Sequence, residues 1–342
     1  MKNHTPYGRI VLACVLCGFL SLAAGSQPAR AQDEPTIAKD SVRITLMSGV
    51  ERRGYSYRGW RPYFEYRVNG PIPSGAQLSV ELSEPTHKNW LKFDCGTGET
   101  EAGRWWEAEC GGESVPDEKA TIYTGMVSFS IRLRNELSGT NATLFSGKFK
   151  VGTLPLVKGA DPEFYVDEDW RIPIGYVFYE EDTGHRATFL NVGFWIRGNP
   201  ATVEAHLFYQ GKEIAKFDRA GNEGRDWHPE NYQWGFYKCP FIGVYKDDPG
   251  EEGGYDPRFA VSKNPGEYEV KALVGHHLAR SIKFTVNADG SFDNGIASAN
   301  KLGSNRVIVP VQVIGNQGPW DRTAWKTGAF YGNPLTGFTA LP

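Results

Sequence analysis

The segment Tyr63-Phe-Glu-Tyr-Arg-Val68 places three apolar side chains, Phe64, Tyr66 and Val68, at every second position. Alternation with a period of two predicts a β-strand that has one face in a core and the other in water. The same alternation occurs in three further segments: Val42–Leu46, Leu78–Leu82 and Val127–Leu133. Strands of this kind are typical of antiparallel sheets that pack face to face.

A second group of alternating segments follows later in the chain. They are Phe189–Ile196, Val203–Tyr209, Tyr232–Tyr237, Tyr268–Val274 and Ile282–Val286. Helical signals are almost absent, because no stretch of about 12 residues combines apolar 3,4-spacing with usable caps. The 40 glycines and 21 prolines suit short strands joined by tight turns. The sequence therefore predicts an all-β fold.

The chain divides by these patterns into two tandem β-sandwich domains, residues 41–152 and 163–290. A flexible arm at 32–40 precedes them, and a linker at 153–162 joins them. Residues 291–342 form an aromatic-rich C-terminal extension, which we expect to pack on a domain or on a partner. A strand within this extension, Val307–Gly315, contains Pro310, and a proline favours an edge position in a sheet.

The two domains look like copies of each other. Four matches occur in the same order: Tyr66–Gly70 with Phe194–Gly198, Leu91–Cys95 with Ala215–Arg219, Trp105 and Cys110 with Trp234 and Cys239, and Ser146–Val151 with Ser281–Val286. The alternative is chance similarity, since β-strand patterns resemble one another. In general outline the repeat resembles immunoglobulin-like or fibronectin-like sandwiches. It lacks the antibody-type Cys…Trp…Cys spacing, because each Trp precedes its cysteine by five residues.

The first 31 residues read as a bacterial-type signal peptide with cleavage after Ala31, and a retained anchor is the alternative. Its removal leaves 34 basic and 40 acidic residues. Such a chain is a poor candidate for binding nucleic acid or an anionic membrane. We therefore expect a secreted or periplasmic protein that does not insert into a membrane after cleavage. Its sequence does not identify a partner, and the candidates are a glycan or another envelope protein.

Three cysteines follow the signal: Cys95, Cys110 and Cys239. An oxidising compartment favours disulfides. Because the repeat puts Arg219 where the first copy has Cys95, we predict a Cys95–Cys110 disulfide. Cys239 is then left as a buried thiol rather than a nucleophile.

Aromatic residues supply the candidate ligand site. Sugar-binding sandwiches use exposed aromatic faces with polar groups nearby, and two matched segments have that composition. Their candidate ligand-binding residues are Trp105, Trp106, Trp227 and Trp234. The alternative is that these rings pack in the core.

Metal and catalytic signals are weak. A calcium site on a glycine-rich loop is conceivable, with the carboxylates of Asp247, Asp248, Glu251, Glu252 and Asp256, but a solvated acidic loop explains the same residues. The acids at 167–169 and 180–182 are likewise interpreted as solvated loops. No nucleophile or phosphate-binding motif appears, so the sequence predicts no catalytic residue and no cofactor.

These observations favour an exported, non-catalytic binding or scaffolding protein. Carbohydrate binding is the more specific form of this hypothesis. One alternative is a secreted hydrolase that acts on envelope or extracellular polymers. Carboxylates that converge in a cleft between the domains would favour this alternative. Another is a structural protein–protein interaction module that docks through its aromatic tail.

Overall fold

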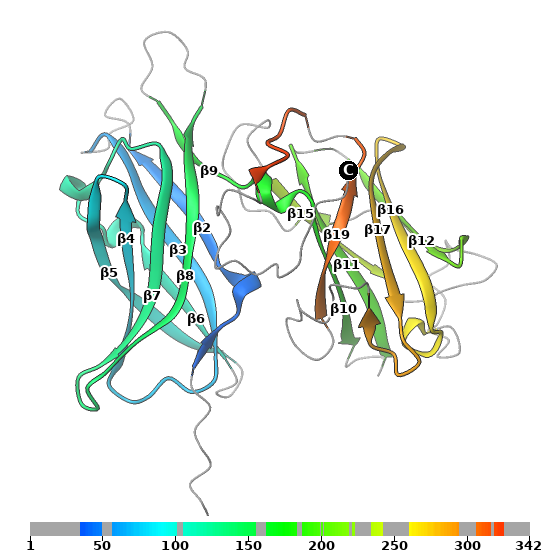
Figure 1. Cartoon of the computed structure of the whole chain (residues 1–342), viewed down its shortest axis with the longest axis horizontal. Helices are drawn as coiled ribbons and strands as arrows, with labels where there is room; N and C mark the ends of the chain where they lie inside the picture. Colours follow the sequence, from blue (N-terminus) through cyan, green and yellow to red (C-terminus); the bar gives the residue numbers. More distant parts are fainter. Residues whose placement is uncertain are drawn as a thin grey trace, which may run out of the picture. The chain divides into compact units, whose positions relative to one another are not determined.

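The computed structural model describes residues 35–49, 57–100, 105–154, 162–182, 187–198, 200, 202–218, 221–222, 234–241, 260–293, 306–315 and 318–324. These residues form two antiparallel sheets, each curled into a sandwich-like domain (Figure 1). The predicted all-β fold class is confirmed. No helix among the described residues is long and apolar enough to span a bilayer.

The first sheet runs in the order β1-β3-β6-β5-β4-β7-β8-β9, with β2 also paired to β3. Its strands are β1 (Thr36–Ile37), β2 (Arg43–Gly49), β3 (Gly59–Asn69), β4 (Ala76–Glu84), β5 (His87–Thr100), β6 (Trp105–Gly111), β7 (Gly125–Asn135), β8 (Thr140–Thr153) and β9 (Phe164–Asp167). The long strand β5 pairs with β4 through its first half and with β6 through its second, so it joins the two layers.

The second sheet runs in the order β13-β12-β16-β17-β19-β10-β11-β15-β14, with β18 beside β17. Its strands are β10 (Ile174–Asp182), β11 (Ala187–Arg197), β12 (Val203–Tyr209), β13 (Lys212–Phe217), β14 (Gly221–Asn222), β15 (Trp234–Phe241), β16 (Gly266–Val274), β17 (His277–Val286), β18 (Phe292–Asp293) and β19 (Arg306–Val313). Short 3-10 turns connect strands in both sheets: η1 (Lys39–Ser41), η3 (Gly112–Ser114), η4 (Asp117–Lys119), η5 (Asp169–Arg171) and η8 (Val261–Lys263).

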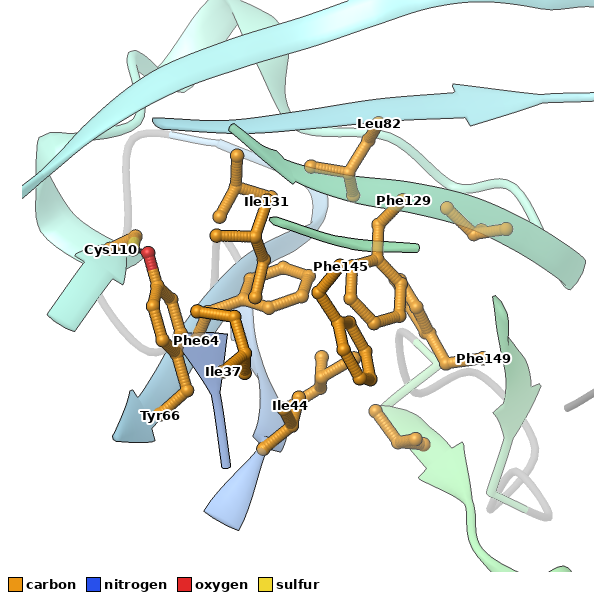
Figure 2. Packing of buried hydrophobic residues seen from close by; sticks show 14 of the residues in the cluster. Ile37, Ile44, Phe64, Tyr66, Leu82, Cys110, Phe129, Ile131, Phe145 and Phe149 are labelled. Atoms are coloured by element: carbon orange, nitrogen blue, oxygen red, sulfur yellow. Dashed lines mark hydrogen bonds between the residues drawn. The ribbon is translucent and has the colours of Figure 1, made fainter. Parts of the chain in front are cut away.

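Aromatic rings fill the space between the layers of the first domain (Figure 2). The ring centroid of Phe64 lies 5.2 Å from that of Phe129 and 6.1 Å from that of Phe149. Phe64 and Phe149 are fully buried. The alternation that places Phe64 inward therefore sends its neighbours Glu65 and Tyr63 to the outer face of β3.

The strand registers of the two sheets coincide at residues that the sequence comparison matched. In each sheet, two of the matched cross-strand pairs lie five residues apart along both strands. In the first sheet they are Asn69 with Trp105 and Phe64 with Cys110, and in the second they are Arg197 with Trp234 and Val192 with Cys239. The remaining matches also fall on corresponding strands, since Phe149 in β8 pairs with β7 as Phe284 in β17 pairs with β16. Equivalent sequences therefore form equivalent ladders.

The two curled sheets differ in where they are closed. In the first, β2 and β9 are not paired as strands, and the Ser48 hydroxyl bridges them by contacting both the N–H and the carbonyl of Phe164. In the second, β10 pairs directly with β19. The strand equivalent to β5 is there divided into β13 and β14.

Two segments lie elsewhere than the sequence suggested. The strand β9 begins at Phe164, inside the range assigned to the second domain, yet it pairs with β8 of the first sheet. The edge position expected for the strand with Pro310 is wrong, because β19 lies between β10 and β17. It pairs with β10 up to Pro310 and with β17 from Val311 onward, so the missing N–H falls where the strand changes partner.

Candidate functional site

A cavity of about 600 Å³ is lined by residues of both sheets, most of which face outward from their strands. One wall comes from the start of β2 and from β3 and β6, and the other from β10, β15 and β19. The lining residues are Ser41, Arg43, Glu65, Tyr66, Arg67, Glu107, Ala108 and Glu109 on the first wall, and Phe178, Glu180, Phe236, Lys238 and Arg306 on the second. Its size is that of a pocket for a small ligand.

Strand alternation builds the first wall. On β6, Ala108 and Cys110 point into the core and are buried, so Glu107 and Glu109 point outward and are exposed. Glu65 on β3 lies directly opposite Glu109. Like charges in opposed positions are destabilising on their own, so this pair favours a compensating cation near it.

Two arginines share the same face. Arg43 of β2 lies opposite Glu65, and Arg67 of β3 lies opposite Glu107. The wall therefore carries three carboxylates and two guanidinium groups in adjacent rows.

The second wall carries cations stacked on an aromatic ring. The guanidinium of Arg306 lies 4.7 Å from the ring centroid of Phe178, and the ammonium of Lys238 lies 5.8 Å from it. Glu180 forms an ion pair with Lys238 at 2.7 Å and accepts a hydrogen bond from Asn191 Nδ2 at 3.0 Å. These contacts restrict the positions of the charges.

The register relates residues of the two walls. Glu109 and Lys238 each lie one position before the matched cysteine, and Glu107 corresponds in the same way to Phe236. The two sheets thus present matched strand positions to the cavity, with Glu109 at one of them and Lys238 at the other.

The tryptophans proposed from sequence do not form one exposed face. Trp234 is 1% exposed, stacks on Tyr165 and donates its indole N–H to Asp169 Oδ1 at 3.0 Å. Burial therefore removes Trp234 as a surface platform, because neighbouring side chains cover its ring. Trp106 is half-buried against the core of the first domain. Trp227 and the side chain of Trp105 lie outside the described residues.

The calcium candidates Asp247, Asp248, Glu251, Glu252 and Asp256 also lie outside the described residues. Within the ranges that the structure describes, no group of three or more His, Cys, Asp or Glu side chains could hold a metal ion.

The predicted disulfide is confirmed. Cys95 and Cys110 are directly opposite each other in β5 and β6 and are bonded. The hydroxyl of Tyr66 lies 3.1 Å from the sulfur of Cys95, and burial raises the pKa of this tyrosine well above its usual range. Cys239 is a free thiol, fully buried, and burial likewise raises its pKa.

The acids at 167–169, interpreted from sequence as a solvated loop, include a buried carboxylate. Asp169 is 4% exposed and accepts hydrogen bonds from Trp234 Nε1 and from the backbone N–H of Asp321. Burial raises its pKa. Trp320 packs against the cluster of Ile172, Trp234 and Val313. The described part of the C-terminal extension therefore packs back on the second domain.

Sequence reasoning missed the glutamates and cations of the cavity. Alternation on β3 and β6 indicates that Glu65, Glu107 and Glu109 face outward, but it cannot show which strands of the second repeat lie across from them.

No model of a known protein family matches the chain, and no curated protein is significantly similar to it in sequence.

Proposed function

We propose that this chain is an exported, non-catalytic binding protein that holds a polar ligand, a glycan in the first instance, in the cavity between β2-β3-β6 and β10-β15-β19. The observation that carries the proposal is the lining, which combines charges of both signs with half-buried aromatic rings. Carboxylate and guanidinium groups can each make two hydrogen bonds to neighbouring hydroxyls. The rings of Phe178 and Phe236 add apolar contact area.

The cavity replaces the tryptophans as the expected glycan site. Contacts within the protein hold polar groups in the cavity: Lys238 lies over the ring of Phe178 and forms an ion pair with Glu180. A site with fixed polar groups loses less entropy on binding.

A thermal-shift scan of the mature protein against a glycan panel tests the proposal. A glycan at 100 times its dissociation constant should stabilise the protein by about 2.7 kcal/mol. Glu109→Gln and Lys238→Met should abolish the shift. Glu136→Gln is the matched control, because Glu136 is 77% exposed and pairs only at the surface with Arg134. A shift that survives both cavity variants would place the glycan elsewhere and reject the proposed site.

A hydrolase is the second candidate, favoured by the four glutamates that line the cavity. Directly opposed residues in neighbouring strands have Cβ atoms about 5 Å apart, so two opposed glutamates can bring their carboxyl groups to the separation of about 5–5.5 Å that retaining glycosidases use. Glu65 and Glu109 are such a pair. Release of reducing ends from envelope polymers by the native protein, and its loss in Glu65→Gln and Glu109→Gln, would favour this candidate. Binding without turnover would favour the binding protein.

Export forms part of the proposal. The Cys95–Cys110 disulfide suits a periplasmic or extracellular protein. The N-terminal sequence of the mature protein tests cleavage after Ala31.

A further inference from the structure

The charged residues that line the cavity balance one another. Four of them are glutamates and four are arginine or lysine residues. Opposite charges are neighbours in three places: Arg43 lies opposite Glu65, Arg67 lies opposite Glu107, and Lys238 pairs with Glu180 at 2.7 Å. A ligand with a net charge would lose its hydration here without meeting a net opposite charge. The lining therefore favours an uncharged ligand.

The pair of Glu180 and Lys238 offers such a ligand both an acceptor and a donor. Lys238 Nζ and Asn191 Nδ2 both reach Oε2 of Glu180, at 2.7 and 3.0 Å. Among the described residues no side chain contacts Oε1 of Glu180 in this way, so Oε1 can accept from a ligand. An ammonium group carries three N–H bonds, and Glu180 takes one of them. Because a hydroxyl both donates and accepts, two neighbouring hydroxyls of a sugar suit this pair.

The ring of Phe236 supplies an apolar surface beside the pair. Gly193 of β11 lies between Tyr176 of β10 and Lys238 of β15. A Cβ atom at Gly193 would lie 2.3 Å from Cζ of Phe236, so the ring occupies the space that a side chain at this position would fill. Phe236 and Lys238 are two positions apart and share one face of β15. The C–H groups of a sugar ring can therefore contact Phe236 while its hydroxyls reach the pair.

Asn191 fixes the carboxylate of the pair. Its neighbours Leu190 and Val192 lie in the core of the second domain, so its own side chain is on the outer face of β11, where it is fully buried. Its Nδ2 donates to Glu180, but its Oδ1 has no hydrogen-bond partner among the described residues. Burial of an amide with one oxygen unsatisfied disfavours folding, so an apolar side chain would serve packing better. The contact with Glu180 explains why an amide is present.

From these contacts we infer that the ligand is an uncharged sugar, that two of its neighbouring hydroxyls bind Glu180 Oε1 and Lys238 Nζ, and that Asn191 positions this pair. The inference rests on the proposed glycan-binding function and narrows the ligand to neutral sugar residues.

Sugars that share a skeleton and differ in charge test the inference. Glucose is compared with glucuronic acid, N-acetylglucosamine with glucosamine, and chitin oligomers with their deacetylated form. Ligand-observed NMR of mature protein at about pH 6 keeps the amino and carboxyl groups ionised. Each uncharged sugar should bind at least tenfold more tightly than its charged counterpart.

Two results separate this inference from the function on which it rests. A charged sugar or glycan that binds as tightly as any uncharged one would overturn the uncharged ligand, while glycan binding would stand. If none of these sugars binds and no other glycan raises the melting temperature, the proposed function itself is overturned.

Charge variants of the pair should produce a gain of binding, which misfolding cannot mimic. Glu180→Gln leaves the lining with an excess positive charge, so the affinity for glucuronic acid relative to glucose should rise at least fivefold. Lys238→Met should raise glucosamine relative to N-acetylglucosamine in the same way. Lys271→Met is the matched control, because Lys271 lies 4.3 Å from the ring centroid of Phe208 and 3.8 Å from Glu269, outside the cavity lining. Unchanged ratios in both cavity variants would overturn the inference.

The role of Asn191 is tested through its partner. Asn191→Ala should weaken the binding of the uncharged sugar at least fivefold in the wild type and should have no further effect in Glu180→Ala. Melting temperatures confirm that each variant is folded. An equal loss of affinity in both backgrounds would show that Asn191 does not act through Glu180 and would overturn its positioning role.

Discussion

The indole N–H of Trp234 donates to Asp169 Oδ1 at 3.0 Å, while Asp169 Oδ2 accepts from the backbone N–H of Asp321 at 2.8 Å. One buried carboxylate thus joins η5, β15 and the C-terminal extension. Arg197 lies 3.7 Å from the same carboxylate and also donates to the carbonyl of Pro319. A carboxylate can serve all of these donors because it only accepts hydrogen bonds.

Asp169→Asn should lower the free energy of unfolding by about 1–3 kcal/mol. The amide keeps one acceptor oxygen, but its NH₂ group then faces an N–H donor. Urea denaturation at neutral pH measures the loss. Asp218→Asn, at a 65% exposed side chain, is the control and should change little. An unchanged midpoint in Asp169→Asn would contradict the assigned role.

The pH dependence of the same carboxylate follows from the direction of its shift. Burial raises the pKa of Asp169 in the folded state above 3.8, so the native state binds a proton more tightly than the unfolded state. As the pH falls from neutral toward 4, the native protein should therefore gain stability relative to Asp169→Asn. Paired denaturation curves between pH 7 and about 4 measure the difference. If the free energy of unfolding of the wild type relative to Asp169→Asn falls on acidification, this assignment is refuted.

The disulfide closes a loop of 15 residues and should stabilise the first domain by about 3 kcal/mol in the loop-entropy model. The double variant Cys95→Ala/Cys110→Ala should unfold at lower denaturant concentration by that amount. Reduction of the native protein should give a similar loss. Equal stability of the oxidised and reduced proteins would argue that the bond contributes nothing.

Cys239 should be inert in the folded protein. It is fully buried, and its raised pKa disfavours the thiolate that reacts. A thiol reagent should label no cysteine in native mature protein and one per chain after unfolding without reductant. Labelling under native conditions would show that β15 opens readily.

The sequence could predict much of the fold, because alternation at Phe64, Tyr66 and Val68 is a local consequence of one buried face. The repeat also predicted the Cys95–Cys110 bond, since only the first copy carries both cysteines. The position of β19 could not be read in this way. Pro310 argues for an edge, but the strand has a different partner on each side of it, and partner choice is a non-local property.

The cavity was beyond sequence reasoning for a related reason. Glu109 and Lys238 are far apart in the chain, and nothing in the sequence around them indicates that they line the same cavity. Aromatic composition pointed instead to Trp234, whose ring is buried by Tyr165 and by the hydrogen bond to Asp169. Large aromatic residues are more often interior than exposed, and here burial prevailed.

The central claim is that the cavity binds the ligand, and calorimetric titration of mature protein with the glycan that most raises its melting temperature tests this most directly. Wild type, the double variant Glu109→Gln/Lys238→Met and the control Glu136→Gln are compared. We predict a loss of affinity of at least tenfold in the double variant and none in the control. Equal affinity in all three proteins would contradict the account.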